Sequence, residues 1–425
     1  MQRRQFVRGA SAAGVLGLVS ACAGRSGASA PKVVVVGGGY GGATAAKYVR
    51  MWSDYGIEVT LIEPNASFIS CPMSNLVVGG SRAMADITQS FAPLAKYHGV
   101  RLVQDRVTRI DPQRRRVLLA QGGELAYDRL ILSPGVDFVW SNLPGMASEA
   151  AQAKVLHAWK AGVQTVALRR QLEAMPDGGV YALSIPLAPY RCPPGPYERA
   201  CQVAHYFSQF KPRSKVLILD ANEDVTSKAA LFKKAWAERY PGIIEYRPAH
   251  KAVDVDAATG TLKFEFHDDV KADVLNVIPD NRAGEIAVTT GLANMDRRWC
   301  EVDFLTFEST VAKNIHVLGD AVQIAPAMPK SGHMANQHGK TCAAAVVALL
   351  TGQPPNEQPI YNNVCYSFVS STEAVHVASV HRYDAAKKTM LTVPGSGGLS
   401  GAASELEGRY AMAWAANIWA DTLGR

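Results

Sequence analysis

The 425-residue sequence lacks the short motifs that attach a c-type haem or a metal ion to a chain. It contains no CxxCH segment, no CxxC pair and no cluster of Cys and His with zinc-ligand spacing. The apolar stretch at residues 9–21 is too short to cross a bilayer. Charged residues make up 19% and apolar residues 48%, which indicates a globular chain long enough for two or three domains. Any haem that works with this chain would therefore lie on another subunit.

The sequence also has little excess charge once its first 30 residues are set aside. The formal net charge is +7, but residues 1–30 contain four arginines and no acidic residue. The remainder holds 40 basic and 37 acidic residues, a net charge of +3. This nearly balanced charge does not indicate a basic surface that would bind nucleic acid, and we expect no nucleic-acid partner.

The first 30 residues have the composition of an export signal. Arg3 and Arg4 begin a segment that resembles the twin-arginine motif, which directs the export of folded proteins. Residues 28–30 (Ala-Ser-Ala) fit a signal-peptidase site, whereas residues 19–22 resemble a lipoprotein box that would leave Cys22 lipidated. The cleavage site stays open between the two. Either way we expect a periplasmic protein, which is held at a membrane only if Cys22 carries lipid.

Six other cysteines remain, and outside the cytoplasm disulfides persist. The simplest interpretation is that they are buried small hydrophobes or structural disulfides. It suits Cys342, which lies in an Ala-rich run, and it stays open for Cys201 and Cys300. The full set is Cys71, Cys192, Cys201, Cys300, Cys342 and Cys365.

A glycine loop near the start of the chain predicts a dinucleotide site. The strand-like run at residues 32–36 leads into Gly37-Gly38-Gly39-Tyr40-Gly41-Gly42, and a helical pattern follows. In such loops the first glycine permits the tight turn, the second lets the backbone approach a pyrophosphate, and the third allows close helix packing. A second strand at residues 58–62 ends at Glu63, which is placed to bind ribose hydroxyls. The residues predicted to contact the dinucleotide here are Gly37, Gly39, Gly42 and Glu63.

Two later segments indicate that the dinucleotide is FAD and not NAD. Residues 127–135 resemble the strand and turn that close the FAD domain in flavoproteins with two dinucleotide domains. Residues 314–321 resemble their second FAD motif, in which the Asp binds the ribityl chain. A following helix, expected to start near Gly332, would point its positive end at the flavin, with Lys330 beside it. The FAD-contacting residues predicted from these segments are Pro134, Gly135, Gly319, Asp320, Lys330 and Gly332.

A second glycine loop is missing where a nicotinamide domain would carry one. The strand-like residues 179–185 lead into residues 189–196, where prolines surround Cys192. Proline removes the backbone N–H groups that a pyrophosphate would need. We infer that a nicotinamide is not the redox partner, although an irregular NADH-binding loop stays an alternative.

These patterns predict an α/β fold with two dinucleotide-binding, Rossmann-like domains of the glutathione-reductase type, the second lacking its glycine loop, plus a C-terminal α+β domain. Strands are expected again at residues 215–220 and 274–278, with a helix from 198 to 210 and another near 410–419. The predicted bounds are 1–30 for the export signal, 31–154 with 291–354 for the FAD domain, 155–290 for the degenerate domain that carries Cys192, and 355–425 for the C-terminal interface domain.

Three segments carry a specific family resemblance. Residues 68–72 (Phe-Ile-Ser-Cys-Pro), residues 190–199 (Tyr-Arg-Cys-Pro-Pro-Gly-Pro-Tyr-Glu-Arg) and residues 363–367 (Asn-Val-Cys-Tyr-Ser) resemble the flavoprotein subunit of flavocytochrome c sulfide dehydrogenase. The resemblance extends over nearly the whole chain, the signal included. It implies a sulfide dehydrogenase that passes electrons through FAD to a c-type cytochrome subunit in a heterodimer.

The resemblance also implies roles for particular residues. Cys71 matches the cysteine that bonds the flavin 8α-methyl group through a thioether, so FAD would be covalent. Cys192 and Cys365 match the redox disulfide that sulfide attacks, and Glu198 matches a proposed proton acceptor. Sulfide:quinone oxidoreductase is an alternative with the same flavin and disulfide chemistry. A non-catalytic exported flavin electron carrier, which needs no reactive disulfide, is another.

Overall fold

A computed structural model describes residues 29–424, so the twin-arginine motif and Cys22 lie outside the described residues. The first sheet has five parallel strands in the order β19-β9-β1-β2-β5. The valines of residues 33–36 are buried because the central strand β1 has neighbours on both edges and helices packed on it. The strands are β1 (Lys32–Val36), β2 (Glu58–Ile62), β5 (Arg101–Val103), β9 (Arg129–Leu132) and β19 (Ile315–Val317).

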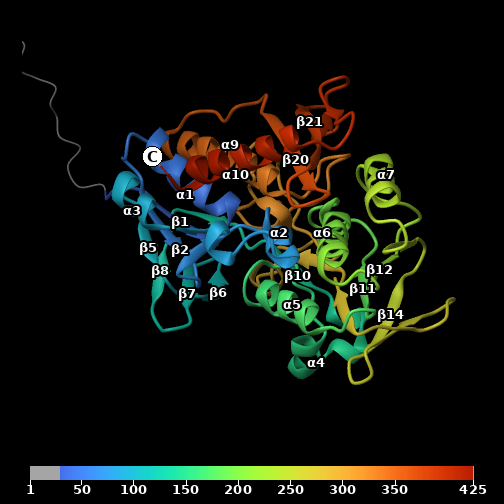
Figure 1. Ribbon diagram of the computed structural model, residues 1–425. Helices are drawn as coiled ribbons and strands as arrows, with labels where there is room; N and C mark the ends of the chain where they lie inside the picture. Colours follow the sequence, from blue (N-terminus) through green and yellow to red (C-terminus); the bar gives the residue numbers. More distant parts are fainter. Residues whose placement is uncertain (1–28, 425) are drawn as a thin grey trace, which may run out of the picture. The chain divides into compact units, whose positions relative to one another are not determined.

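Two helices pack against each other beside this sheet, as Figure 1 shows. α1 (Tyr40–Trp52) follows the glycine loop, and α9 (Gly332–Thr351) follows β19. Their close approach depends on glycine, because a Cβ built on Gly339 of α9 would lie 2.6 Å from the Gly41 carbonyl oxygen. The N-termini of both helices are therefore held side by side.

The second sheet is also parallel, with the order β13-β12-β11-β17. Almost every residue of its two central strands is buried, as in a sheet covered on both faces. The elements are β11 (Val180–Ile185), α6 (Gly195–Phe210), β12 (Lys215–Asp220), α7 (Ala229–Arg239), β13 (Ile244–Arg247) and β17 (Val274–Val277).

The C-terminal segment forms an antiparallel sheet and a long helix. β20 (Ile360–Phe368) pairs with β21 (Ala374–Asp384), which also pairs with β22 (Thr389–Thr392) and β23 (Gly398–Leu399). α10 (Glu405–Leu423) packs on α1 and β20, and Figure 1 shows it running alongside α9. This segment brings β20 against α9 and α6, the helices that accompany the first and second parallel sheets.

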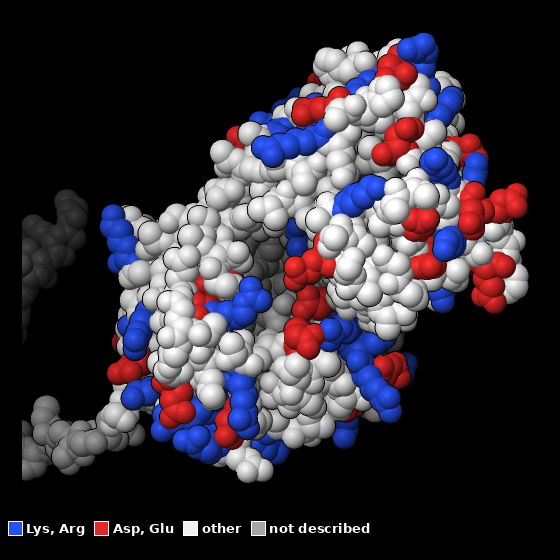
Figure 2. All heavy atoms as spheres, turned by 90° about the horizontal axis from the view of Figure 1, so that it is seen from below, with Lys and Arg blue, Asp and Glu red and all other residues white. Residues whose placement is uncertain are grey.

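The remaining elements are short and connect or flank these sheets. No helix in residues 29–424 combines the length and the apolar character that crossing a membrane requires. On the face drawn in Figure 2, acidic and basic side chains are interspersed around a central hollow. The short elements are β3 (Ser67–Ile69), α2 (Ser74–Gly79), β4 (Thr88–Ser90), α3 (Ala92–His98), β6 (Val107–Asp111), β7 (Arg116–Leu119), β8 (Glu124–Ala126), β10 (Val136–Phe138), α4 (Glu149–Lys154), α5 (Val163–Ala174), β14 (Ala252–Asp256), β15 (Thr261–Phe264), β16 (Val270–Lys271), β18 (Asn281–Ala283) and α8 (Glu285–Thr289).

The sequence-based elements agree closely with the structure. β1, β2 and β12 have the predicted bounds, and α9 begins at Gly332 as expected. α6 begins three residues before the predicted start at Glu198, because Gly195 and Pro196 form its first turn. The predicted domain bounds are not tested by these elements and stay a prediction.

We predict that Gly42→Ala destabilises the fold, whereas Gly39→Ala does not. A Cβ at residue 42 would lie 1.9 Å from the Gly37 carbonyl oxygen, while a Cβ at residue 39 has no heavy atom of the described chain within 4 Å. Overpacking of this kind costs about 1–3 kcal/mol. Thermal unfolding followed by circular dichroism measures the difference. Equal melting temperatures for the two variants would contradict the packing role assigned to Gly42.

Candidate functional site

The glycine loop leaves backbone amides free at the start of α1. Gly37 has φ +96°, the left-handed backbone that the turn after β1 requires. Gly39 is the N-cap of α1 and provides no side chain to bind the first amides of the helix. Glu63, at the end of β2, accepts a hydrogen bond from the Gly38 amide at 2.7 Å and is also bonded by Asn65. Free amides at a helix N-terminus bind phosphate, and the Glu63 carboxylate keeps lone pairs for a further donor.

The start of α9 faces the same pocket. Ser331 caps the helix, since its hydroxyl accepts a hydrogen bond from the Met334 amide at 3.0 Å. Gly332 packs against Tyr40, because a Cβ there would lie 3.0 Å from the tyrosine ring. Asp320 lines this part of the pocket, and burial raises the pKa of its carboxyl group while Arg191 and Lys330 oppose that rise.

Cys192 sits at a strained point of the loop between β11 and α6. Its φ is +56°, a left-handed conformation that is unfavourable for a residue with a side chain. Two hydrogen bonds hold the loop: the Cys192 amide donates to the Lys330 carbonyl at 2.8 Å, and the Arg191 amide donates to Asn281 Oδ1 at 3.1 Å. The loop is thereby tied to the segment that precedes α9. We infer that the strain serves to aim the Cys192 thiol into the pocket.

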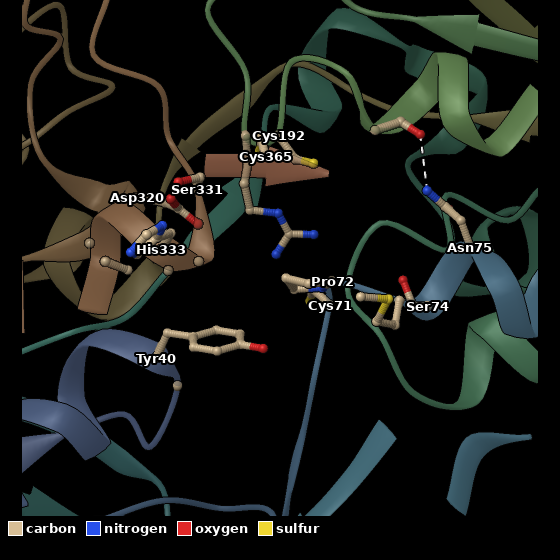
Figure 3. A pocket seen from close by; sticks show the side chains of 18 of the residues that line it. Tyr40, Cys71, Pro72, Ser74, Asn75, Cys192, Asp320, Ser331, His333 and Cys365 are labelled. Carbon is tan, nitrogen blue, oxygen red and sulfur yellow. Dashed lines mark hydrogen bonds between the residues drawn. The ribbon is translucent and has the colours of Figure 1, made fainter. Parts of the chain in front are cut away.

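The two cysteines predicted as a redox pair line one central pocket, which Figure 3 shows from close by. Cys192 comes from the loop before α6 and Cys365 from the middle of β20. Both are free thiols in the structure, which corresponds to the reduced state of the pair, so the disulfide stays a prediction. Cys365 lies close enough to Cys192 to raise the pKa of the Cys192 thiol. The fold therefore brings together the two cysteines that sequence spacing alone did not pair.

Glu198 is buried beside the cysteines and holds two hydrogen bonds. Its carboxylate accepts from Asn75 Nδ2 at 2.8 Å, the bond drawn in Figure 3, and from the Phe368 amide at 2.8 Å. Burial raises the pKa of the Glu198 carboxyl group, and these hydrogen bonds and the Lys228 charge offset part of the rise. Glu198 thus joins α2, α6 and β20 at the pocket wall.

Burial also raises the pKa of both thiols. For Cys192 the charges of Cys365 and Glu198 add to this rise, and Arg191 and Lys228 oppose it. For Cys365 burial acts first, and Lys228 is the main opposing charge. The thiolate forms are therefore costly in this pocket unless a cation lies close to the sulfur.

Nine of the fourteen predicted site residues line the central pocket and five do not. Gly37 and Gly42 pack against each other within the glycine loop, and Glu63 accepts a hydrogen bond from the amide of Gly38 in that loop. Pro134 packs on Gly284. The nine that line the pocket are Gly39, Cys71, Gly135, Cys192, Glu198, Gly319, Asp320, Gly332 and Cys365.

Lys330 does not line the central pocket, although Asp320 beside it does. Its ammonium group donates to the carbonyl oxygens of Asp320 and Val322 at 3.0 and 2.5 Å and lies 3.8 Å from the centroid of the Trp299 ring. Burial lowers the pKa of Lys330 to about 7. These contacts tie Lys330 to the turn before α9, and its place beside a bound flavin stays a prediction.

Sequence reasoning missed Arg191, although it adjoins Cys192. Its side chain lines the pocket, and its buried Nε has no hydrogen-bond partner in the described residues. Burial alone would lower the pKa of Arg191, but the negative charges of Cys71, Asp320 and Cys192 raise it above its usual value. Trp159 and Trp414 also line the pocket with unpartnered indole N–H groups.

These features fit a bound FAD. The pocket, its opening to solvent included, has a volume of about 1260 Å³ and is lined by both helix N-termini. Open space next to Gly39 lets a phosphate approach the backbone. The unpartnered donors of Trp159, Arg191 and Trp414 can bind polar atoms of a ligand, and donors that are buried without a partner are rare in proteins.

Comparison with known proteins identifies the family. Residues 165–279 match the family described as sulfide dehydrogenase (flavocytochrome c) flavoprotein chain, central, and residues 357–423 match flavocytochrome c sulphide dehydrogenase, flavin-binding. A sulfide dehydrogenase (flavocytochrome c) flavoprotein chain from Chlorobaculum thiosulfatiphilum is 59% identical over 46 residues, which are 11% of this chain and 94% of that relative. The chain belongs to this family. The flavin-binding match supports FAD as the cofactor of this chain.

Other relatives place the flavoprotein in a wider group. The mitochondrial sulfide:quinone oxidoreductase of Dictyostelium discoideum is 25% identical over 303 residues, which cover 68% of this chain and 65% of that protein. The chain thus spans just under two thirds of that relative's length. The X-ray structure of the sulfide:quinone oxidoreductase from Aquifex aeolicus has a TM-score of 0.75 at 18% identity and covers 93% of this chain and 92% of its own. Residues 31–171 match the pyridine nucleotide-disulphide oxidoreductase family. The predicted fold class is confirmed.

We predict that Glu198→Gln changes the pH dependence of stability. The folded-state pKa of Glu198 is raised, so its contribution to stability is fully present below about pH 4.3, the usual unfolded value, and is lost as pH rises through the raised pKa. The Gln variant has no such titration. The unfolding temperature of the wild type, relative to the variant, should therefore fall between pH 4 and pH 9. A difference that stays constant over this range would contradict the raised pKa.

Proposed function

We propose that this flavoprotein is an FAD-dependent sulfide dehydrogenase in which sulfide attacks a Cys192–Cys365 disulfide and electrons pass through FAD to a c-type cytochrome subunit. The observation that carries the proposal is the presence of both cysteines in the pocket that the glycine loop and the start of α9 also line. Glu198 adds a proton-accepting group within the same buried cluster. A non-catalytic electron carrier would need none of these three residues there.

The chain's own residues suit attack by a small, soft anion. Hydrosulfide opens a disulfide by thiol–disulfide exchange, which yields a persulfide on one cysteine and a thiolate on the other. The pocket is partly apolar and buried, so a small anion that enters it needs a nearby cation, such as the Arg191 guanidinium that lines the pocket, to offset its desolvation cost. Glu198, with its raised pKa, can take up the proton that the persulfide releases.

The cofactor would be held from three sides. Gly39 and the first amides of α1 would face the pyrophosphate, and the start of α9 with Asp320 would face the flavin half. Cys71 would bond the flavin covalently, and the Arg191 guanidinium, which hydrogen-bonds to the Cys71 side chain, would lie beside that bond. When bound, the flavin supplies a two-electron acceptor that can release electrons one at a time.

The acceptor and the location follow from the family and from residues 1–30. A one-electron acceptor suits the flavoprotein chain of a flavocytochrome c, and the expected export signal would deliver the protein to the periplasm. Trp414 of α10 lines both the central pocket and a shallow surface groove with His333 and Tyr366, which offers a short route from the pocket to a docked haem protein. The partner would be a c-type cytochrome subunit.

A sulfide:quinone oxidoreductase is the second candidate, because proteins of that name share this fold and 25% identity with the chain. It would use the same cysteines and flavin, but a membrane quinone would accept the electrons. Reoxidation of the sulfide-reduced protein separates the two. We expect a c-type cytochrome to reoxidise it rapidly and a soluble quinone analogue to do so slowly. The reverse order would favour the second candidate.

We predict that sulfide bleaches the flavin of the oxidised protein anaerobically, and that Cys192→Ser and Cys365→Ser abolish this reaction. A serine at either position cannot form the disulfide that sulfide attacks. Cys201→Ser is the matched control, since Cys201 is buried on α6, is bonded by Trp236 Nε1 and does not line the pocket. Stopped-flow absorbance at the flavin band gives the rates. Bleaching of both pocket variants at the wild-type rate would end the proposed mechanism.

A separate prediction concerns the covalent link at Cys71. Acid precipitation of the wild type should leave the flavin in the pellet, whereas the flavin of Cys71→Ala should stay in the supernatant. The residue lines the pocket as a free thiol, so the substitution removes only the bonding sulfur. The flavin absorbance of pellet and supernatant measures the outcome. Flavin that is extracted from the wild type would show that the link does not form.

A further inference from the structure

A buried lysine lies beside the cysteine pair although nothing in the sequence marks it. Lys228 is 5% exposed and is the N-cap of α7, with φ +57°. Its ammonium group donates to the Cys365 carbonyl oxygen at 2.8 Å and to the Ser367 hydroxyl at 2.8 Å. The lysine therefore reaches from the second parallel sheet onto β20, 137 residues further along the chain.

Among the residues that the structure describes, no carboxylate forms an ion pair with the Lys228 ammonium group. Neutral oxygens accept its two hydrogen bonds, and within residues 29–424 no third acceptor is bonded to it. Burial of the ammonium lowers the pKa of Lys228, while the negative charges of Cys365, Glu198, Cys192 and Glu407 raise it, with Cys365 first among them. A buried charge without a counter-ion is costly, so an anion formed at Cys365 would meet a cation already in place.

Lys228 affects the two thiols differently. At Cys365 it is the charge that most opposes the rise in the thiol pKa, whereas at Cys192 Arg191 opposes that rise more than Lys228 does. Arg191 in turn interacts more strongly with Cys71 and Asp320 than with Cys192. The charged groups that face Cys365 are Lys228 from the start of α7, Glu198 from α6 and Asp320 from the turn before α9.

We propose that Lys228 is the counter-ion of the Cys365 thiolate and thereby sets the direction in which the disulfide opens, a role that rests on the proposed function. Hydrosulfide attacks Cys192 Sγ, a new S–S bond forms there, and the Cys192–Cys365 bond breaks. The electron pair of the broken bond stays on Cys365 Sγ as a thiolate, and the proton stays on the new persulfide. One negative charge enters and one remains, so the step balances. The better-stabilised thiolate is the better leaving group.

Persulfide mapping on the holoenzyme tests this direction. The oxidised protein receives about one equivalent of sulfide without oxygen, is quenched with an alkylating reagent and is analysed by peptide mass spectrometry. We expect the extra sulfur on Cys192 in the wild type and in Lys228→Arg, and a loss of this selectivity in Lys228→Met. Lys211→Met is the matched control, because Lys211 is also buried and also donates to backbone carbonyls, those of Leu172, Glu173 and Met175, away from the cysteines.

The outcomes separate the two proposals. Extra sulfur on Cys365 in the wild type, or unchanged selectivity in Lys228→Met, would overturn the role of Lys228 and leave the sulfide dehydrogenase proposal intact. Extra sulfur on neither cysteine would end the proposed mechanism instead.

A second measurement tests the counter-ion role of Lys228 even if neither cysteine carries extra sulfur. The rate at which iodoacetamide alkylates Cys365 in the reduced protein, measured against pH, should be about tenfold lower near neutral pH in Lys228→Met, because less thiolate is present. The Lys228→Arg and Lys211→Met proteins should keep the wild-type profile. An unchanged profile in Lys228→Met would refute the counter-ion role.

Discussion

The hydrogen bond from the Cys192 amide to the Lys330 carbonyl is the contact on which the site depends. It ties the loop after β11 to the segment that leads into α9, and so joins the second parallel sheet to the first. Pro193 and Pro194 follow Cys192 and have no amide hydrogen, so this donor has no neighbouring substitute before Gly195. This bond helps to stabilise the left-handed backbone of Cys192, whose thiol lies beside Cys365 in the pocket (Figure 3).

The rest of the site follows from how three remote segments meet at that point. Glu198 on α6 accepts from the Phe368 amide of β20 and from Asn75 of α2, which fixes the position of Cys365 relative to Cys192. Lys228 makes the same connection from α7. The carboxyl group, the ammonium group and both thiols are buried together. A change of charge on one of them therefore shifts the pKa values of its neighbours.

Local patterns predicted the first sheet and the start of α9 well, because these depend on contiguous residues. The local sequence explains three of these features: the strand of four successive valines, the glycine loop, and the start of α9 at Ser331-Gly332. The sulfur side was predictable only in part. The family resemblance named Cys192, Cys365 and Glu198, but Lys228 reaches β20 through tertiary packing that no local pattern reveals.

The contacts of Lys330 were not predictable from the local sequence either. A cation just before a helix that faces a flavin suggests a contact with the ring, and the structure adds contacts with the carbonyls of Asp320 and Val322 and with the face of Trp299. Arg191, a cation that does line the pocket, was overlooked because a turn with positive φ follows it and redirects the chain.

The most direct test of the central claim is an anaerobic titration of the oxidised holoenzyme with dithionite, followed through the flavin spectrum. A flavin in redox contact with a Cys192–Cys365 disulfide should take up about four electron equivalents, two for each centre. Uptake of only about two equivalents per flavin, with Cys192→Ser indistinguishable from the wild type, would contradict the account.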